Sequence, residues 1–167
     1  VRLGVSGIIL EDQLWPKKCG HMEGKSVIPM EEHVQKIRAA SYARGDGDLV
    51  IIARTDAIAP LGLEEAIRRG HAYVEAGADV IFIEAPESID QLSQISDSFD
   101  TPLFANMIEG GKTPVLPKAE LAEMGFQLIL YPLAGLFAAA HAVEFMFRKL
   151  KADETTIGKE SRLTVML

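Results

Sequence analysis

The sequence predicts an α/β fold of the (β/α)₈ barrel type, with five strands that correspond to the last five βα units of eight. The expected strands are apolar along their whole length, which is typical of a parallel sheet covered on both faces. Strands alternate with helical patterns along the chain. Later strands begin near residues 49, 79, 103 and 126, roughly 23 to 30 residues apart, which suits a barrel of about 250 residues. An open doubly wound sheet fits the length of 167 residues better, but no Gly-rich phosphate loop follows the first strand.

The first three elements are a strand, a long loop and a helix. Residues 5–10 form a short apolar run that predicts a buried strand. Residues 13–29 show no hydrophobic period and contain two prolines and two glycines, so they form a loop of a length that is typically functional. Residues 30–43 place apolar side chains at helical spacing, with Glu31 and Glu32 in the first turn, where the helix dipole favours acids.

The same patterns predict the remaining elements. Apolar runs predict strands, apolar residues three and four positions apart predict helices, and glycine and proline mark turns. The order is strand 49–53, helix 63–74, strand 79–83, helix 89–99, strand 102–105, Gly-rich loop 107–117, short helix 118–124, strand 126–130 and long amphipathic helix 133–150. We therefore expect a partial barrel domain over residues 1–151 and a polar tail over residues 152–167.

Composition excludes several kinds of partner. The formal net charge of −7 and the pI of about 5.1 provide no basic face for nucleic acid, although a small anionic substrate needs only one local cluster of donors.

No apolar run reaches the roughly 18 residues of a membrane span, and no signal peptide is visible. One cysteine cannot form an internal disulfide, so we expect a cytoplasmic protein. The first residue is Val1, which suggests a start inside a longer chain.

Polar residues follow four consecutive strands. The strands end at Glu11-Asp12, Arg54-Thr55-Asp56, Glu84 and Asn106. In a barrel these ends converge on the face that carries the active site. Carboxylates, an amide and a guanidinium suit a hydrated Mg²⁺ ion and an anionic substrate. The alternative is that each polar residue only caps its strand.

The single cysteine lies in the long loop after the first strand, in the run Lys17-Lys18-Cys19-Gly20-His21. Two adjacent lysines favour a thiolate, so Cys19 is a candidate acid, base or nucleophile. A buried structural cysteine is the first alternative. A metal site at Cys19 and His21 is the second, although two ligands without a second pair make a weak zinc signal.

A third group of residues, Asn106 to Pro114, contains two glycines that permit close backbone approach to a ligand. Lys112 can bind a carboxylate or phosphate, although the Walker spacing is absent. A plain Gly-rich turn is the alternative. His33, His71 and His141 fall in expected helices and are interpreted as surface or packing residues.

Together these segments resemble the isocitrate lyase/phosphoenolpyruvate mutase superfamily, from about Gly4 to Lys151. The run Lys17–Met22 resembles the isocitrate lyase signature hexapeptide. The other similar blocks, in the family's order, are Glu11–Gln13, Ala53–Ala57, Glu84-Ala85 and Asn106–Pro114. The resemblance is closest to the short members: methylisocitrate lyases, dimethylmalate lyases, oxaloacetate-cleaving enzymes and carboxyphosphonoenolpyruvate mutases.

The resemblance implies a (β/α)₈ barrel whose last helix is swapped between subunits, in a homodimer or homotetramer, and a Mg²⁺ cofactor. It implies that Glu11 holds metal-bound water and that Cys19 is the general acid on a gating loop. The family places further aspartates at the metal and a Ser/Gly substrate segment in three βα units that would precede Val1. The remaining implied roles are support of Cys19 by Lys17 and His21, substrate binding by Arg54, Glu84, Asn106 and Gly20, and pocket shaping by Glu109, Gly111 and Thr113.

The expected reaction is Mg²⁺-dependent retro-aldol cleavage of a methylisocitrate-like or alkylmalate-like 2-hydroxy acid. Cys19 favours this lyase reaction, since the family's phosphonate-active members generally do not use the cysteine. Phosphonomutase, or oxaloacetate hydrolase or decarboxylase activity, is the first alternative, because Gly110-Gly111-Lys112 differs from the methylisocitrate lyase pattern. A non-catalytic remnant that oligomerises through its terminal helix is the second.

Overall fold

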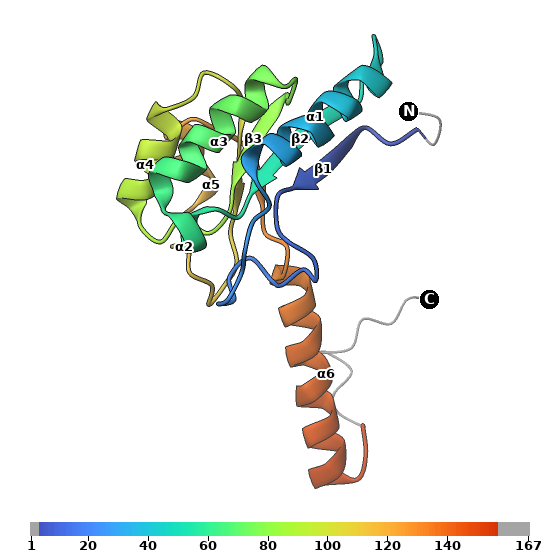
Figure 1. Cartoon of the computed structure of the whole chain (residues 1–167). Helices are drawn as coiled ribbons and strands as arrows, with labels where there is room; N and C mark the ends of the chain where they lie inside the picture. The colour runs from blue at the N-terminus through green and yellow to red at the C-terminus, as the bar shows by residue number, and fades with distance from the viewer. Residues whose placement is uncertain (1–3, 157–167) are drawn as a thin grey trace. The chain divides into compact units, whose positions relative to one another are not determined.

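Five parallel strands form one sheet in the computed structural model, which describes residues 4–156 (Figure 1). The strands are β1 (Gly7–Glu11), β2 (Val50–Thr55), β3 (Val80–Ile83), β4 (Leu103–Asn106) and β5 (Phe126–Leu130). They lie in the order β1-β2-β3-β4-β5, so each strand pairs with the next along the chain. A doubly wound sheet reverses this order at its switch point, whereas a barrel does not. The strand order therefore confirms the barrel type of α/β fold.

The helices agree with the sequence prediction except for one short addition. They are α1 (Met30–Arg44), α2 (Ile58–Leu61), α3 (Leu63–Glu75), α4 (Ile89–Asp97), α5 (Lys118–Glu123) and α6 (Ala134–Asp153). Ser88 caps the N-terminus of α4, where its side chain accepts a hydrogen bond from the Gln91 backbone N–H. The sequence did not predict α2, a single turn containing Pro60 that is too short to show a hydrophobic period.

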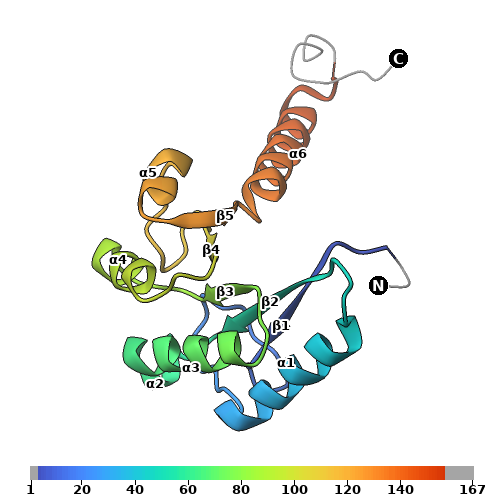
Figure 2. The ribbon, with the colours of Figure 1, turned by 90° about the horizontal axis from the view of Figure 1, so that it is seen from above.

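The main core lies between the sheet and the helices of residues 4–131. Strand residues such as Ile51, Ile81 and Leu103 pack there against helix residues such as Ile37 and Leu92. Figure 2 shows α1, α3, α4 and α5 along the same side of the sheet. This is the arrangement of a barrel wall, whose helices all cover its outer surface.

The other face of the sheet, called here the open face, carries a smaller apolar cluster made only of strand residues. Ile52, Val80, Phe82 and Phe104 form it, with Leu128 packed at its edge. Ile9 on β1 is 48% exposed on this face. In a closed barrel this face would be the interior.

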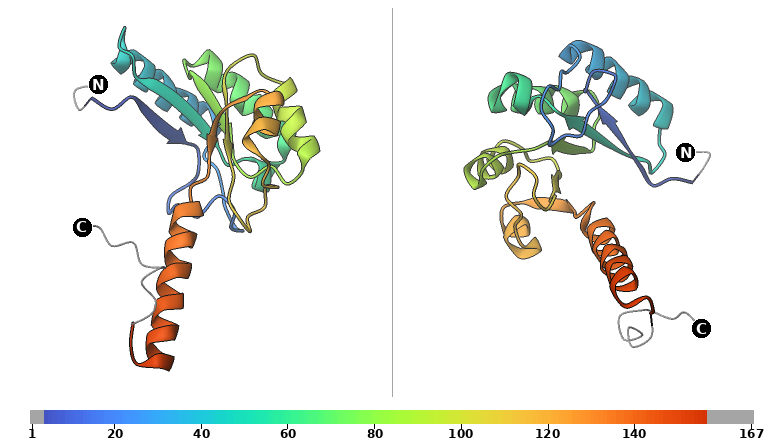
Figure 3. Two further views of the ribbon diagram at one scale, coloured as in Figure 1. Left: turned by 180° about the vertical axis from the view of Figure 1, so that it is seen from behind. Right: turned by 90° about the horizontal axis from the view of Figure 1, so that it is seen from below.

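Contacts divide the chain into two units, Val1–Tyr131 and Pro132–Leu167. In the second unit, α6 is one continuous helix with no buried residue (Figure 3). Among residues 4–156, no helix combines the length and apolar character needed to cross a membrane. The expected division into a domain over 1–151 and a tail over 152–167 stays a prediction, because residues 157–167 of that tail lie outside the described residues.

Candidate active site

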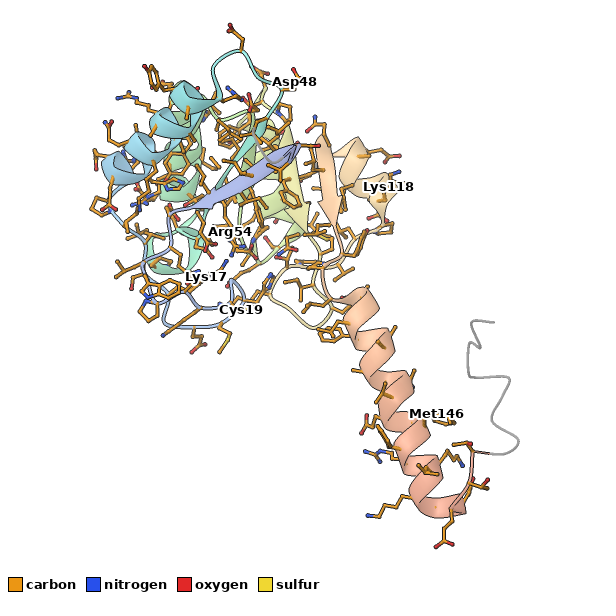
Figure 4. All side chains as sticks on the ribbon, turned by 90° about the vertical axis from the view of Figure 1, so that its right-hand side faces the viewer. Lys17, Cys19, Asp48, Arg54, Lys118 and Met146 are labelled. Carbon is orange, nitrogen blue, oxygen red and sulfur yellow. The ribbon has the colours of Figure 1, made fainter. Side chains whose placement is uncertain are left out.

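Four predicted site residues lie at the carboxyl ends of neighbouring strands. Glu11 ends β1 and pairs in register with Arg54 of β2, Glu84 follows β3, and Asn106 ends β4. Figure 4 shows Lys17 and Cys19 at one end of residues 4–131 and Asp48 at the other, with Arg54 between them on the side of Lys17. The structure therefore brings the predicted residues of the strand ends and of the Cys19 loop, residues 12–29, to the same end of the sheet.

Strand geometry separates residues that are adjacent in the sequence. Successive side chains of a strand point to opposite faces. Arg54 is two residues beyond Ile52 and shares the open face with it, whereas Thr55 points toward the helices and is fully buried. Glu11 and Asp12 are separated in the same way.

Arg54 is the centre of the site. Its Nε donates to Asp56 Oδ2 at 2.9 Å and its Nη2 to Asp56 Oδ1 at 3.1 Å. Nη2 also lies 3.2 Å from Glu84 Oε2, and Nε lies 3.3 Å from Glu11 Oε2. Burial by itself would lower the pKa of Arg54, but the hydrogen bonds to Asp56 and the charges of Glu84 and Glu11 raise it. The guanidinium therefore stays charged, as the binding of an anionic substrate requires.

Glu84 joins Arg54 to two other segments. Its side chain is 1% exposed. Asn106 Nδ2 donates to its two oxygens at 3.3 and 3.4 Å, and His21 Nε2 lies 2.9 Å from Oε1 in a poorly aligned contact. The Lys112 backbone N–H donates to His21 Nδ1 at 2.9 Å, so the proton of a neutral His21 ring is on Nε2, facing Glu84.

The Cys19 loop packs its backbone directly on this pair of charges. A Cβ atom added to Gly20 would lie 2.5 Å from Glu84 Cγ and 2.7 Å from Arg54 Nη2. Cys19 itself is an exposed free thiol. The ammonium of Lys17 is paired with Glu11 Oε2 at 2.8 Å. Lys17 and His21 therefore bind the two carboxylates that flank Arg54, and the predicted support of Cys19 by these residues stays a prediction.

The Gly-rich loop, residues 107–117, meets the Cys19 loop at Gly111. A Cβ atom on Gly111 would lie 2.6 Å from His21 Nδ1, so only glycine leaves room for the ring. Thr113 is 3% exposed, and its hydroxyl has no hydrogen-bond partner among the described residues. Glu109 is exposed on the same loop, and Lys112 Nζ pairs with Glu87 at 3.0 Å.

The structure corrects one interpretation of the strand ends, because Asp12 does not face the site. Its carboxylate is fully buried and accepts hydrogen bonds from the Thr55 hydroxyl, Arg69 Nη1, the Tyr73 hydroxyl and the Asp56 N–H, at 2.7 to 2.9 Å. Arg69 also donates to the Ile28 carbonyl at 2.9 Å. Asp12 therefore ties β1, β2, α3 and the end of the Cys19 loop together.

Sequence reasoning assigned no partner to Asp56 and missed Lys25. Burial would raise the pKa of Asp56, but the hydrogen bonds and charge of Arg54, with the ammonium of Lys25, hold it below its ordinary value. Lys25 Nζ lies 3.3 Å from Asp56 Oδ1. No local sequence signal marks this pair, since 31 residues separate its members.

The residues that the structure describes do not form a complete metal site by themselves. No group of three or more His, Cys, Asp or Glu side chains in residues 4–156 is arranged to hold a metal ion. Glu11 is 23% exposed on its side chain and is the predicted contributor, but one carboxylate does not bind Mg²⁺ without further ligands.

The chain resembles a family of known enzymes over nearly all its length. The family model described as phosphoenolpyruvate phosphomutase matches residues 1–151. The petal death protein of Dianthus caryophyllus is 52% identical over 93% of this chain and 49% of its own length. The 2,3-dimethylmalate lyase of Eubacterium barkeri is 46% identical over 94% of this chain and 54% of its own. The 2-methylisocitrate lyase of Bacillus subtilis is 46% identical over 88% of this chain and 48% of its own length.

Solved structures of the same superfamily match the fold of this chain. A 2,3-dimethylmalate lyase described as a PEP mutase/isocitrate lyase superfamily member matches with a TM-score of 0.91 and 40% identity, over 98% of this chain and 55% of its own. A phosphonopyruvate hydrolase complex with oxalate and Mg²⁺ matches with a TM-score of 0.80 and 33% identity, over 99% of this chain and 57% of its own. The chain therefore spans about half the length of the relatives it matches, and the match to barrel lyases confirms the predicted fold class.

Proposed function

The chain belongs to the phosphoenolpyruvate mutase/isocitrate lyase superfamily, and from this premise we propose that it provides the Cys19 loop and the arginine centre of a lyase that cleaves a C–C bond. The proposed substrate is a small 2-hydroxy di- or tricarboxylate of the methylisocitrate or alkylmalate type. The observation that carries the proposal is the seating of Gly20 against Arg54 and Glu84. It supports a loop that brings a thiol to a partly buried cation.

In the proposed reaction a carboxylate of the site takes the proton of the substrate 2-hydroxyl, and Arg54, which binds a substrate carboxylate, stabilises the resulting alkoxide. The alkoxide becomes the C=O group of the 2-oxo acid as the C–C bond breaks. Preorganised charge of this kind lowers the barrier most in a site from which water is excluded. The electron pair of the broken C–C bond passes to the leaving fragment, and Cys19 gives its Sγ proton to that carbon. Closure of the Cys19 loop brings the thiol to the substrate and keeps water out.

Glu84, Asn106 and the Gly-rich loop form the proposed opposite wall of the pocket. The unpartnered Oδ1 of Asn106 and hydroxyl of Thr113 are buried atoms that a substrate oxygen or hydroxyl can satisfy. We propose Glu11 as this chain's contribution to a Mg²⁺ site, through metal-bound water. When bound there, Mg²⁺ would supply Lewis-acid stabilisation of the negative charge on the substrate oxygen.

Cys19→Ser tests the acid role. Because a general acid contributes about 10²- to 10⁴-fold to rate, we expect kcat for cleavage of 2,3-dimethylmalate or 2-methylisocitrate to fall at least 100-fold while KM changes little. Glu23→Ala changes an exposed side chain of the same loop and is the matched control, with activity expected within twofold of wild type. Unchanged kcat in Cys19→Ser would overturn the acid role.

Phosphonate chemistry is the second candidate function. The likeness to the phosphonopyruvate hydrolase favours it, and the superfamily scaffold also suits oxaloacetate cleavage. Phosphorus NMR of phosphonopyruvate incubations would reveal reactions at the P–C bond. Analysis of the products formed from oxaloacetate would reveal oxaloacetate cleavage. Titration with Mg²⁺ and oxalate, a mimic of the enolate, addresses the non-catalytic alternative, which predicts no binding heat.

We also propose that copies of the protein associate through α6 and that the enzyme acts in the cytoplasm. The exposed apolar side chains Leu136, Val143, Phe147 and Leu150 recur at helical spacing and are 40% to 66% exposed. Such a stripe is typical of a helix that packs against a partner. Light scattering of Phe147→Glu should show a smaller assembly than wild type, and an unchanged mass would argue against this role.

A further inference from the structure

Lys25 is a buried lysine that the proposed reaction does not use. Its side chain is 1% exposed, although it belongs to a loop whose neighbouring residues Gly24 and Ser26 are exposed. A lysine ammonium is rarely buried unless it is paired, because it loses its hydration. Its partners therefore indicate what the burial achieves.

The two partners of Lys25 belong to different parts of the site. Lys25 Nζ donates a hydrogen bond to the carbonyl of Gly20, the residue that follows Cys19. The same nitrogen lies 3.3 Å from Oδ1 of Asp56, a fully buried carboxylate. Asp56 in turn accepts two hydrogen bonds from Arg54. One ammonium thus connects the backbone beside the thiol to the carboxylate that orients the guanidinium.

Other contacts hold the Cys19 loop at different points. Two backbone hydrogen bonds of 2.8 Å fix its base. The Leu14 N–H donates to the Ser26 carbonyl, and the Ile28 N–H donates to the Asp12 carbonyl. Lys18 Nζ donates to the Gly24 carbonyl, but this contact is exposed and stays within the loop. The bond from Lys25 is the one among the described contacts that joins the Gly20 backbone to Asp56.

Resting on the function proposed above, we propose that Lys25 is a positioning residue that holds the Cys19 loop closed over Arg54, through the Gly20 carbonyl and Asp56. It acts through these two groups and does not touch the reacting atoms. Without Lys25, Asp56 would keep both hydrogen bonds from Arg54, so no buried charge would be left unpaired. The fold is therefore expected to survive its removal, while the closed position of the loop is not.

The test compares Lys25→Met and Lys25→Gln with wild type and with Lys36→Met. The control removes another lysine–carboxylate pair, Lys36–Glu32 at 3.0 Å, which lies on the exposed surface of α1. Hydrogen exchange of the amides in residues 17–24 reports loop closure without requiring activity. Steady-state kinetics on the cleaved acid reports the effect on the reaction, and circular dichroism reports the fold.

We expect amide protection in residues 17–24 to fall at least fivefold in Lys25→Met, and kcat to fall 10- to 100-fold with KM changed less than threefold. Lys25→Gln, which keeps a donor, should recover part of the protection, and Lys36→Met should match wild type. Unchanged protection, kcat within threefold of wild type, or loss of the fold in both variants would overturn the proposal. If wild-type protein cleaves none of the acids, the proposed function fails, and the exchange measurement still decides whether Lys25 holds the loop.

Discussion

Replacing Gly20 with alanine places a methyl group at the contact between the Cys19 loop and the charged centre. The added Cβ would lie 2.5 and 2.6 Å from Glu84 Cγ and Cδ, and 2.7 Å from Arg54 Nη2. Ordinary contacts begin near 3.4 Å, so one side must retreat by about 1 Å. Glu84 is 1% exposed and bound to Arg54, whereas Cys19 is exposed. The loop is therefore the side that moves.

A displacement of about 1 Å in a reacting group costs about 100-fold in rate, which corresponds to about 2.7 kcal/mol of activation free energy. We expect Gly20→Ala to lower kcat/KM for the cleaved acid by about this factor. The melting temperature should change little, because the loop contributes few residues to the core. Amide exchange in residues 17–24 should accelerate, since the loop no longer seats on Arg54.

The assay measures release of the 2-oxo acid by purified wild type, Gly20→Ala and the exposed-loop control Glu23→Ala, with melting curves for all three. Activity of Gly20→Ala within threefold of wild type, with unchanged amide exchange, would show that the added methyl group does not displace the loop. It would mean that the reaction does not need the close packing of Gly20 on Arg54 and Glu84.

Three further predictions concern stability. Asp12→Ala should lower the free energy of unfolding by about 3–5 kcal/mol, because buried Arg69 loses a partner; a loss below 1 kcal/mol in urea titration would contradict this. Burial lowers the pKa of His33 to about 4, so the buried neutral ring favours the folded state fully above pH 6.5. As the pH falls toward 4, the free energy of unfolding should decrease by about 3 kcal/mol. His33→Leu should flatten that part of the stability curve, and an unchanged curve would refute the assignment. Ala85 is buried at a φ of 61° beside Glu84, so Ala85→Val should destabilise by about 2–3 kcal/mol, whereas Ala85→Gly should stay within about 1 kcal/mol in thermal melts.

The fold could be predicted because its signals are local. Unbroken apolar runs and helical spacing placed all five strands and every helix except α2 to within a few residues. Local patterns do not separate a barrel from a doubly wound sheet, because both alternate strands with helices. The order β1-β2-β3-β4-β5 decided it.

The candidate site was predicted in part for the same reason. The carboxyl ends of parallel barrel strands converge on one face, so the sequence predicted that Glu11, Arg54, Glu84 and Asn106 lie close together, as they do. Lys25 was not predicted as a site residue, because nothing in the sequence of a polar loop indicates that one of its lysines is buried. Asp12 was misplaced, because a strand that is apolar throughout shows no alternation that would assign its two faces.

The order of amino acids establishes which chemical groups the chain carries, from the Cys19 run to the acids, arginine and amide at the strand ends. These are covalent and local facts. Which groups meet depends on the folded chain: Glu11 faces Arg54 while Asp12 faces Arg69, Gly20 packs on Glu84, and Lys25 pairs with Asp56. Strand pairing fixes which residues lie in register and on which face of the sheet, and it joins segments that are dozens of residues apart. The predicted role of Cys19 thus depends on a loop position that long-range contacts maintain.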